Sequence, residues 1–273
     1  MFSFIGSIVL LILGYVFYSH VVERVFGIQP ELPTPAIEKT DGMDYVPMRP
    51  WRSFLIQLLN IAGTGPIYGA IMGACFGPQV FLWIVFGSIF AGVVHDYSTG
   101  MMSVRFRGRN IPEIVKRVVG PGAQLLMRVF CIALLVLVGA VFTIQPASTI
   151  SYVFNFPDWT PLVAFLVIAY YFLSTVLPID KLIGRIYPVF AVFLLFMCVC
   201  LLSIIIVNIS DIPEITDFEF GASYHLPAWP FMFVTVACGA VSGFHATQSP
   251  IIARCITNEK QGRSVFYGSM IME

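Results

Sequence analysis

Charged residues are scarce in this sequence. Only 11% of its 273 residues are Asp, Glu, Lys or Arg, against roughly 25% in soluble domains. The 15 basic and 15 acidic residues leave no net charge, which argues against a nucleic-acid partner. Hydrophobic residues make up 58% of the chain, and its mean hydropathy is +0.87. This composition predicts an all-α polytopic membrane protein.

Patterns typical of catalytic and metal sites are also missing. The apolar runs contain no paired carboxylates, no HExxH and no cysteine–histidine ligand spacing, so we expect neither an enzyme nor a metal centre. The cysteines fall mostly inside apolar runs, which predicts buried free thiols instead of a disulfide framework. They are Cys75, Cys131, Cys198, Cys200, Cys238 and Cys255.

Long apolar runs dominate what is present. A membrane-spanning helix needs about 20 mainly apolar residues, and seven segments qualify: 2–20, 54–76, 79–102, 124–146, 161–178, 184–208 and 229–250. The first lacks the basic start and the cleavage site of a signal peptide, so we expect it to be retained. An eighth run begins at SVFYGSMIME and stops at Glu273. We therefore expect a single transmembrane domain over 1–273, truncated after about seven spans, that is the N-terminal part of a longer protein.

The basic residues predict the orientation. All 15 Lys and Arg residues lie on one side: between spans one and two, between three and four, between five and six, after span seven, or at the start of spans four and six. The loops on the opposite side, 147–160 and 209–228, contain none. The positive-inside rule then puts the basic loops in the cytoplasm and the N-terminus outside. An amphipathic cytoplasmic helix that lies along the lipid headgroups is predicted for FRGRNIPEIVKRVVG, with Asn110 as its N-cap.

Two of the spans carry helix-breaking residues. The second contains Gly63, Gly65 and Pro66, and the seventh contains Gly239 and Gly243 among small polar residues. Non-helical backbone at membrane depth persists only where protein or a watery cavity satisfies it, so such breaks tend to mark a binding site. The alternative is close helix packing, since the glycines at 65, 69 and 73 keep a four-residue spacing.

The placement of the breaks favours transport. If 1–20 is a peripheral first span, the breaks fall in core helices one and six, which run in opposite directions. That arrangement is typical of an inverted repeat in which an interrupted helix leads each half. We therefore expect a first five-helix repeat at 54–208 and the start of a second at 229–273.

Polar side chains near the breaks provide candidate substrate ligands. Gln57, Asn60 and Thr64 have the spacing of one helix face, and exposed backbone groups at each break could hold an anion or a cation. Helix–helix hydrogen bonding is the alternative role for each polar side chain. The predicted substrate-binding residues are Asn60, Gly63, Thr64, Gly65, Gly239, Ser242, Gly243, Thr247 and Gln248.

Three ionisable residues are candidates for proton coupling or gating. An intramembrane ionisable group is costly and is a functional hypothesis by default, and His245 lies within span seven. His95 and Asp96 adjoin each other near the inner end of span three, and Asp96 is the only carboxylate inside the seven predicted spans. The alternatives are a neutral structural role for His245 and a salt bridge from Asp96 to Arg105 or a neighbouring basic loop.

Four stretches together resemble the carbon starvation protein A family: NIAGTGPIYGAIMGACFGPQ, GVVHDYSTGMMSVRFRGRNIPEIV, GAVSGFHATQS and the terminal GSMIME. The resemblance runs from about Val25 to the end of the chain. It implies a leucine-transporter-like fold of the amino acid–polyamine–cation superfamily. It also implies an inner-membrane protein linked to starvation that takes up peptides or, in a close branch, pyruvate with protons. No residue role is carried over from the family.

We therefore expect a secondary transporter that imports short peptides or pyruvate. The coupling ion would be a proton or Na⁺, the partners are a small substrate and the bilayer, and the oligomeric state stays open. No buried carboxylate is predicted near either break to pair with a peptide's ammonium, which favours pyruvate or another monocarboxylate. The alternative is a membrane nutrient sensor without transport. A channel fits two interrupted helices less well than alternating access does.

Overall fold

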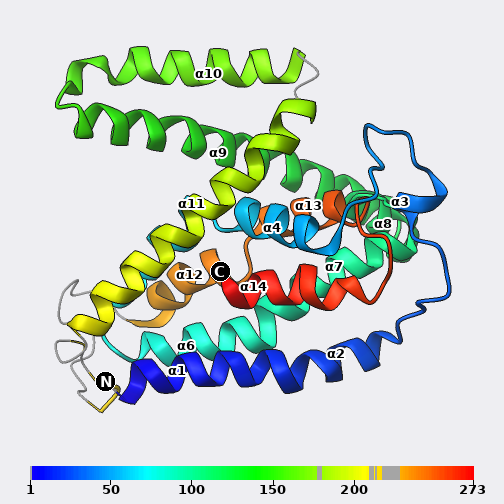
Figure 1. The fold of residues 1–273 in the computed structure, drawn as a ribbon, viewed down its shortest axis with the longest axis horizontal. Coiled ribbons are helices and arrows are strands. Elements are labelled where there is room, and N and C mark those ends of the chain that lie inside the picture. Colours follow the sequence, from blue (N-terminus) through cyan, green and yellow to red (C-terminus); the bar gives the residue numbers. More distant parts are fainter. Residues whose placement is uncertain (1, 177–179, 209–211, 213, 217–227) are drawn as a thin grey trace.

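A computed structural model describes residues 2–176, 180–208, 212, 214–216 and 228–273. The regular elements in these residues are all helices (Figure 1). Five helices in this part of the chain are long and apolar enough to cross a membrane: Phe2–Phe26, Val80–Arg105, Pro121–Val153, Val189–Val207 and Trp229–Ile252. The pair Pro50–Ile61 and Gly65–Ala74, whose halves meet at 56°, is a sixth candidate if the two helices form one broken span. The all-α polytopic prediction is confirmed.

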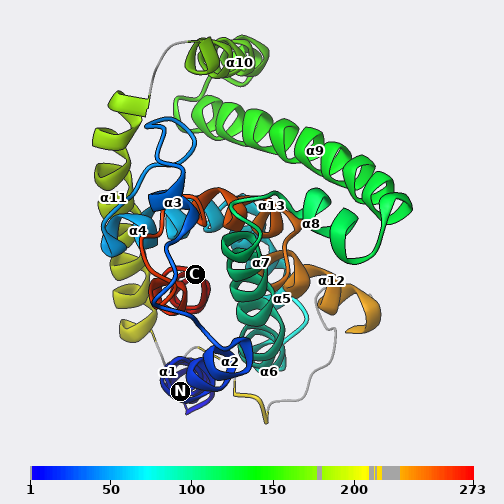
Figure 2. The same cartoon turned by 90° about the vertical axis from the view of Figure 1, so that its right-hand side faces the viewer.

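The seventh predicted span is the weakest. Segment 161–178 corresponds to α10 (Thr160–Val176), a shorter apolar helix, and its last two residues lie outside the described part of the chain. It follows α9 (Pro121–Val153) and the 3₁₀ turn η3 (Pro157–Trp159), and the two helices form a hairpin in which α9 contacts α8 and α13 while α10 lies at the outside (Figures 1 and 2). The count of seven spans and the inverted repeat therefore stay predictions.

Both predicted helix breaks are present. α4 (Pro50–Ile61) ends before Ala62, and α5 (Thr64–Ala74) begins after Gly63. Pro66 thus lies in the first turn of α5, where a missing N–H breaks no helical hydrogen bond. α12 (Ala228–Ala240) and α13 (Gly243–Ile252) are separated by Val241 and Ser242.

Three π-helical turns interrupt the helices, and the first of them contacts the other two. They are η1 (Gly14–Tyr18), which joins α1 (Phe2–Leu13) to α2 (Ser19–Phe26); η2 (Gly87–Gly92), which joins α6 (Val80–Phe86) to α7 (Val93–Arg105); and η5 (Arg263–Gly268), which precedes α14 (Ser269–Met272). The Tyr267 hydroxyl donates a 2.9 Å hydrogen bond to the Gly14 carbonyl. Ile89 packs against Gly14, where a β-carbon would lie 2.8 Å from its side chain. π-turns free backbone groups and often accompany functional sites.

The core lies between α7, α13 and η5. Val93, Tyr97, Met101, Ile256 and Phe266 are fully buried in it. α14 extends from this core toward the middle of the bundle, where it contacts α4, η2 and α7. The outer side chains of α9, α10 and α11 (Asp180–Val207) are mostly exposed and apolar, as lipid-facing surfaces are.

Near the basic loops, the short helices α3 (Pro35–Glu38) and α8 (Ile111–Val118) complete the fold. Asn110 is at the N-cap position of α8 as predicted, but its side chain makes no capping bond. Its Oδ1 instead accepts a hydrogen bond from Arg254 at 2.9 Å.

The cysteines are free, but the expectation that they are buried is wrong for most of them. Only Cys255 is buried, while Cys198, Cys200 and Cys238 are exposed. These three lie on α11 and α12, whose neighbouring exposed side chains are apolar. Because a thiol behaves as a small hydrophobic group, it is compatible with a lipid-facing surface.

Candidate functional site

The centre of the site is a close contact between a carboxyl group and a histidine ring that lie far apart in the sequence. Packing of α7 against α13 brings Asp96 Oδ2 to 3.3 Å from His245 Nδ1. Both side chains are buried, at 0% and 1% exposure. The neighbouring His95 is bonded through Nδ1 to Asp96 Oδ1 at 2.9 Å. The structure therefore brings together all three residues predicted for proton coupling.

Glu273 extends this pair into a chain of three residues. Its Oε1 lies 3.6 Å from His245 Nε2, and its side chain is 4% exposed. We call Asp96, His245 and Glu273 the acid–histidine chain; it links α7 and α13 to the end of α14. Glu273 was not among the predicted site residues because carboxylates were sought only inside the seven complete spans. The signal available was its position at the end of the apolar run GSMIME.

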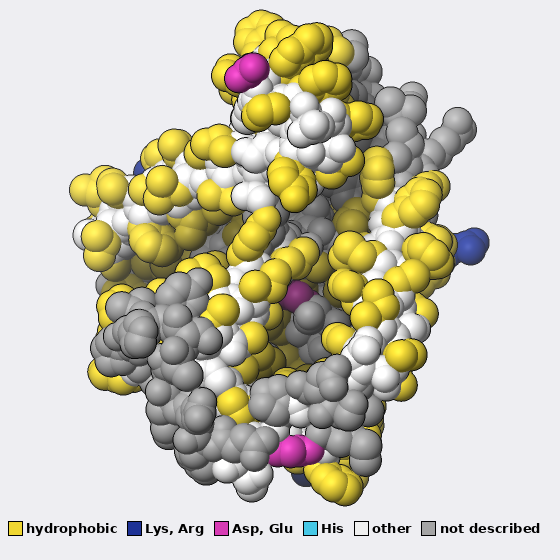
Figure 3. Space-filling view, turned by 90° about the vertical axis from the view of Figure 1, so that its left-hand side faces the viewer, with side chains coloured by type: hydrophobic (Ala, Val, Ile, Leu, Met, Phe, Trp, Pro, Cys, Tyr) yellow, Lys and Arg dark blue, Asp and Glu magenta, His cyan; other side chains and the backbone are white. Residues whose placement is uncertain are grey.

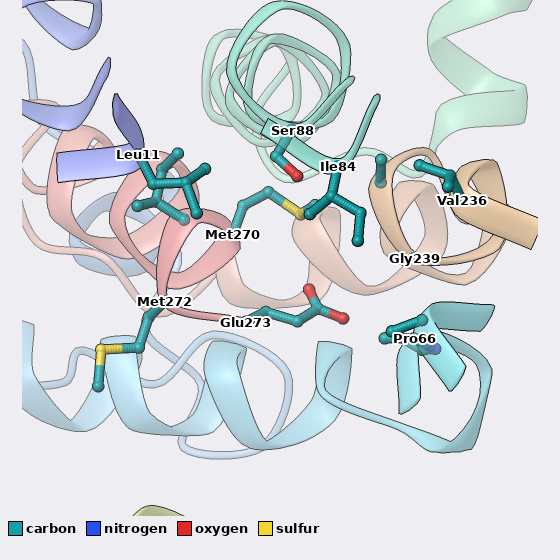
Figure 4. Close-up of a pocket in the computed structure, with 12 residues that line it drawn as sticks. Leu11, Pro66, Ile84, Ser88, Val236, Gly239, Met270, Met272 and Glu273 are labelled. Atoms are coloured by element: carbon teal, nitrogen blue, oxygen red, sulfur yellow. The ribbon is translucent and has the colours of Figure 1, made fainter. Parts of the chain in front are cut away.

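A cavity of about 220 Å³ opens beside Glu273. In Figure 4 the Glu273 carboxylate points into this cavity between Pro66 of α5 and Ser88 of η2. Gly239, one residue before the end of α12, lines the same cavity. The rest of the wall is largely apolar, so Glu273 supplies the only carboxylate among the residues that line it. Figure 3 shows one face of the molecule with a hollow between hydrophobic surfaces and an acidic side chain inside it.

A second cavity, of about 230 Å³, lies toward α11. It shares Pro66, Ala70, Met272 and Glu273 with the first. Both carboxylate oxygens of Glu273 are buried without a hydrogen-bond partner among the described residues. An acceptor in this state, between two cavities, is suited to bind a cationic or hydrogen-bond-donating group.

The predicted substrate residues do not form one site. Gly239 lines the Glu273 cavity, but Thr247 and Gln248 line a different cavity of about 330 Å³ beside α8 and α9. Gly243 packs against Leu134, where a β-carbon would lie 2.2 Å from the side chain. Ser242 caps α13 by accepting the Phe244 N–H at 3.3 Å. These residues point in different directions because the orientation of α13 about its axis is set by packing against α7 and α4.

The prediction that Gln57, Asn60 and Thr64 share one face of a single helix is wrong. The break at Ala62 and Gly63 separates Thr64 from the other two residues, and the Thr64 side chain is outside the described part. Asn60 is half-buried in the last turn of α4. Gln57 donates a 3.2 Å hydrogen bond to Ser249 on α13, which is the helix–helix role given as its alternative.

The structure also tests two alternatives from the sequence, glycine packing at the first break and a salt bridge from Asp96 to Arg105. Glycine packing is confirmed for α5: a β-carbon on Gly69 would lie 2.5 Å from the Thr235 carbonyl oxygen of α12, and one on Gly65 would lie 3.3 Å from Cys238 Sγ. The salt bridge from Asp96 to Arg105 is not formed. Arg105 pairs instead with Glu259 at 3.2 Å.

Comparison with known proteins identifies the family. The family described as "Carbon starvation protein CstA" matches residues 1–153 and 145–273. The chain belongs to the carbon starvation protein CstA family. No solved structure is significantly similar to it.

Several curated relatives match nearly the whole chain. A Haemophilus influenzae "Uncharacterized membrane protein" is 40% identical, with 100% of this chain and 87% of that protein covered. The Escherichia coli "Peptide transporter CstA" is 29% identical over 98% of this chain, and the "Pyruvate/proton symporter BtsT" of the same organism is 27% identical over 98%. The chain spans 48% and 46% of these two transporters, about half their length.

The CstA-family match also reveals an internal difference in length. The alignment with the Haemophilus protein covers 328 positions, whereas this chain has 273 residues, so that relative carries at least 55 positions that this chain lacks. The two family segments overlap at 145–153, which points to the end of α9 as the place of the difference. Fifty-five residues are enough for two spans. The number of helices between the two breaks can therefore differ between this chain and that relative.

Proposed function

We propose that this chain belongs to a secondary active transporter that imports short peptides across the cytoplasmic membrane with protons. In this proposal the basic loops face the cytoplasm and the N-terminus faces out. The observation that carries it is the acid–histidine chain, buried beside both helix breaks. The names of the CstA-family relatives support the transporter class.

His245 is the proposed proton carrier. Histidine changes charge within the physiological pH range, and its ring lies between the carboxylates of Asp96 and Glu273, at 3.3 and 3.6 Å. A buried charge is tolerated where an opposite charge accompanies it. Gain or loss of a proton at His245 therefore changes the charge balance of the whole buried chain.

Glu273 is the proposed ligand for the substrate's ammonium group. The sequence argument favoured pyruvate because no buried carboxylate was predicted near either break. Glu273 is such a carboxylate, so that argument against a peptide no longer applies. Its carboxylate faces a cavity lined by Pro66 and Gly239, one residue from each break region. Pyruvate has no cation to pair with Glu273, whereas every unblocked peptide has one.

Proton and substrate would then act on the same carboxylate. An ammonium group on Glu273 competes with the His245 ring for that carboxylate, so the affinity for one cation depends on the other. Such coupling is reciprocal in free energy. We expect the apparent affinity for peptide to change with pH, and the effect of pH to vanish when Glu273 is neutralised.

The test is uptake and binding of a labelled dipeptide and of labelled pyruvate by the protein in liposomes, with and without an inward proton gradient. We expect gradient-driven dipeptide uptake in the wild type and at least about a hundredfold loss in Glu273→Gln, the range typical of removing a buried charged ligand. Glu31→Gln, an exposed carboxylate, is the matched control. Dipeptide binding without uptake would identify a sensor, and accumulation of pyruvate alone would refute the role of Glu273.

A further inference from the structure

A pocket rich in basic side chains lies at the end of the molecule that carries α3 and α8. It measures about 740 Å³, and seven Lys or Arg side chains line it. The carboxylates that line it are Asp44 and Glu113. In a chain with no net charge, nearly half of the 15 basic residues converge on this one concave surface, which we call the basic pocket.

Three of the seven basic side chains are held by protein groups. Arg254 donates to the Gly108 carbonyl at 2.8 Å, Arg107 lies 3.8 Å from Glu38, and the Lys39 ammonium donates to the Arg107 carbonyl at 3.0 Å. These contacts fix one wall of the basic pocket and join α3 to the loop before α8.

The other four basic side chains lack such partners. Arg109, Lys116, Arg117 and Arg128 have no carboxylate within ion-pair distance among the described residues. They come from three consecutive parts of the chain: the loop before α8, the last turn of α8 and the second turn of α9. Like charges gathered around one pocket repel each other, and an anion in the pocket relieves that repulsion.

The pocket adjoins a lipid-facing surface. On α8, Ile111 and Ile114 are buried, while Val118 and Val119, directly after Arg117, are 67% and 71% exposed. At the start of α9, Leu125 and Leu126 are also exposed, just before Arg128. Cations beside exposed apolar side chains at the end of a spanning helix match the two parts of a phospholipid, its headgroup and its acyl chains.

We propose that the basic pocket binds the headgroup of an anionic phospholipid. The phosphate contacts Lys116, Arg117 and Arg128, and the acyl chains lie along Val118 and Leu125. Inorganic phosphate could pair with the same basic side chains, but it would leave the exposed apolar residues uncovered. A phospholipid covers both sets of residues. α8 then serves as the anchor that fixes the depth of the basic loops in the membrane.

The experiment measures binding of phosphatidylglycerol to the purified protein by native mass spectrometry, with phosphatidylcholine as the neutral lipid. Lys116→Gln, Arg117→Gln and Arg128→Gln are combined in one variant. Arg24→Gln, Arg49→Gln and Lys260→Gln form the matched control, since these three exposed residues lie outside the pocket. Arg117→Lys with Arg128→Lys keeps the charge and tests whether charge alone restores binding.

We expect the pocket variant to bind phosphatidylglycerol at least about tenfold more weakly, given roughly a fivefold contribution from each cation near an anionic headgroup. The control and the Lys variant should bind as the wild type does, and an excess of inorganic phosphate should not displace the lipid. Equal weakening in the pocket variant and the control would overturn the proposal. Displacement by inorganic phosphate would overturn it in favour of a phosphate site.

Discussion

The two broken spans cross each other, and the two sides of that crossing differ in chemistry. On one side α5 packs on α12 through glycines, with Gly69 against the backbone of Thr235. On the other side α4 packs on α13 through a polar contact, in which Gln57 donates to Ser249, and α13 also places His245 against Asp96 of α7. We call these the glycine side and the polar side.

The difference shows that packing and binding are not competing explanations for a broken helix. The glycine side brings two backbones close together, which needs small residues. The polar side carries the ionisable groups, which need burial and partners. Each half-helix has its own role, so one span contains both a packing surface and part of a site.

The largest expected effect is on the polar side, from Asp96→Asn. The change leaves a protonated His245 with one carboxylate instead of two, and removing one partner of a buried charge pair costs about 3–5 kcal/mol. We expect loss of proton-driven uptake with the protein still folded, because neutral His245 needs no counter-charge. Uptake rates at several external pH values, with Asp158→Asn as an exposed control, measure it. If uptake by Asp96→Asn depended on pH as uptake by the wild type does, Asp96 would have no role in proton coupling.

The next largest effect is on the glycine side, from Gly69→Ala. The added β-carbon would lie 2.5 Å from the Thr235 carbonyl oxygen, so α5 and α12 must move apart, at a cost of about 1–3 kcal/mol. We expect a lower thermal unfolding temperature with unchanged proton dependence of the remaining uptake. Gly139→Ala is the control, because its β-carbon would have no neighbour within 4 Å. Equal stability of the two variants would mean that α5 and α12 pack less closely than described.

Local chemistry allowed much of this arrangement to be predicted. Glycine and proline inside apolar runs located both breaks to within a few residues, and the cost of an ionisable group in a membrane singled out Asp96 and His245. Their contact could not be predicted, because 149 positions separate them and only the packing of α7 on α13 brings them together. The periodicity of α13 likewise could not show that His245 faces inward while Thr247 lines another cavity.

Glu273 and the number of spans could not be predicted because both depend on where each span begins and ends. Glu273 follows the last turn of an apolar helix, and a search for carboxylates confined to complete spans does not reach it. The count of spans was limited in a different way, since α10 is near the minimum length for a crossing. Composition predicts that a segment is apolar, but whether it crosses the membrane depends on its neighbours.

The smallest expected effect tests the boundary between the two sides, at Ser242. Its hydroxyl caps α13, whereas Gly63 at the other break gives α5 no side-chain cap. Ser242→Ala should lower stability by about 1 kcal/mol, and Ser242→Thr should restore it. Thermal unfolding and amide exchange at Phe244 measure the loss. His245 lies on the first turn of α13. If Ser242→Ala also changed the proton dependence of uptake, the cap would be shown to orient the acid–histidine chain. The polar side would then begin at the break itself.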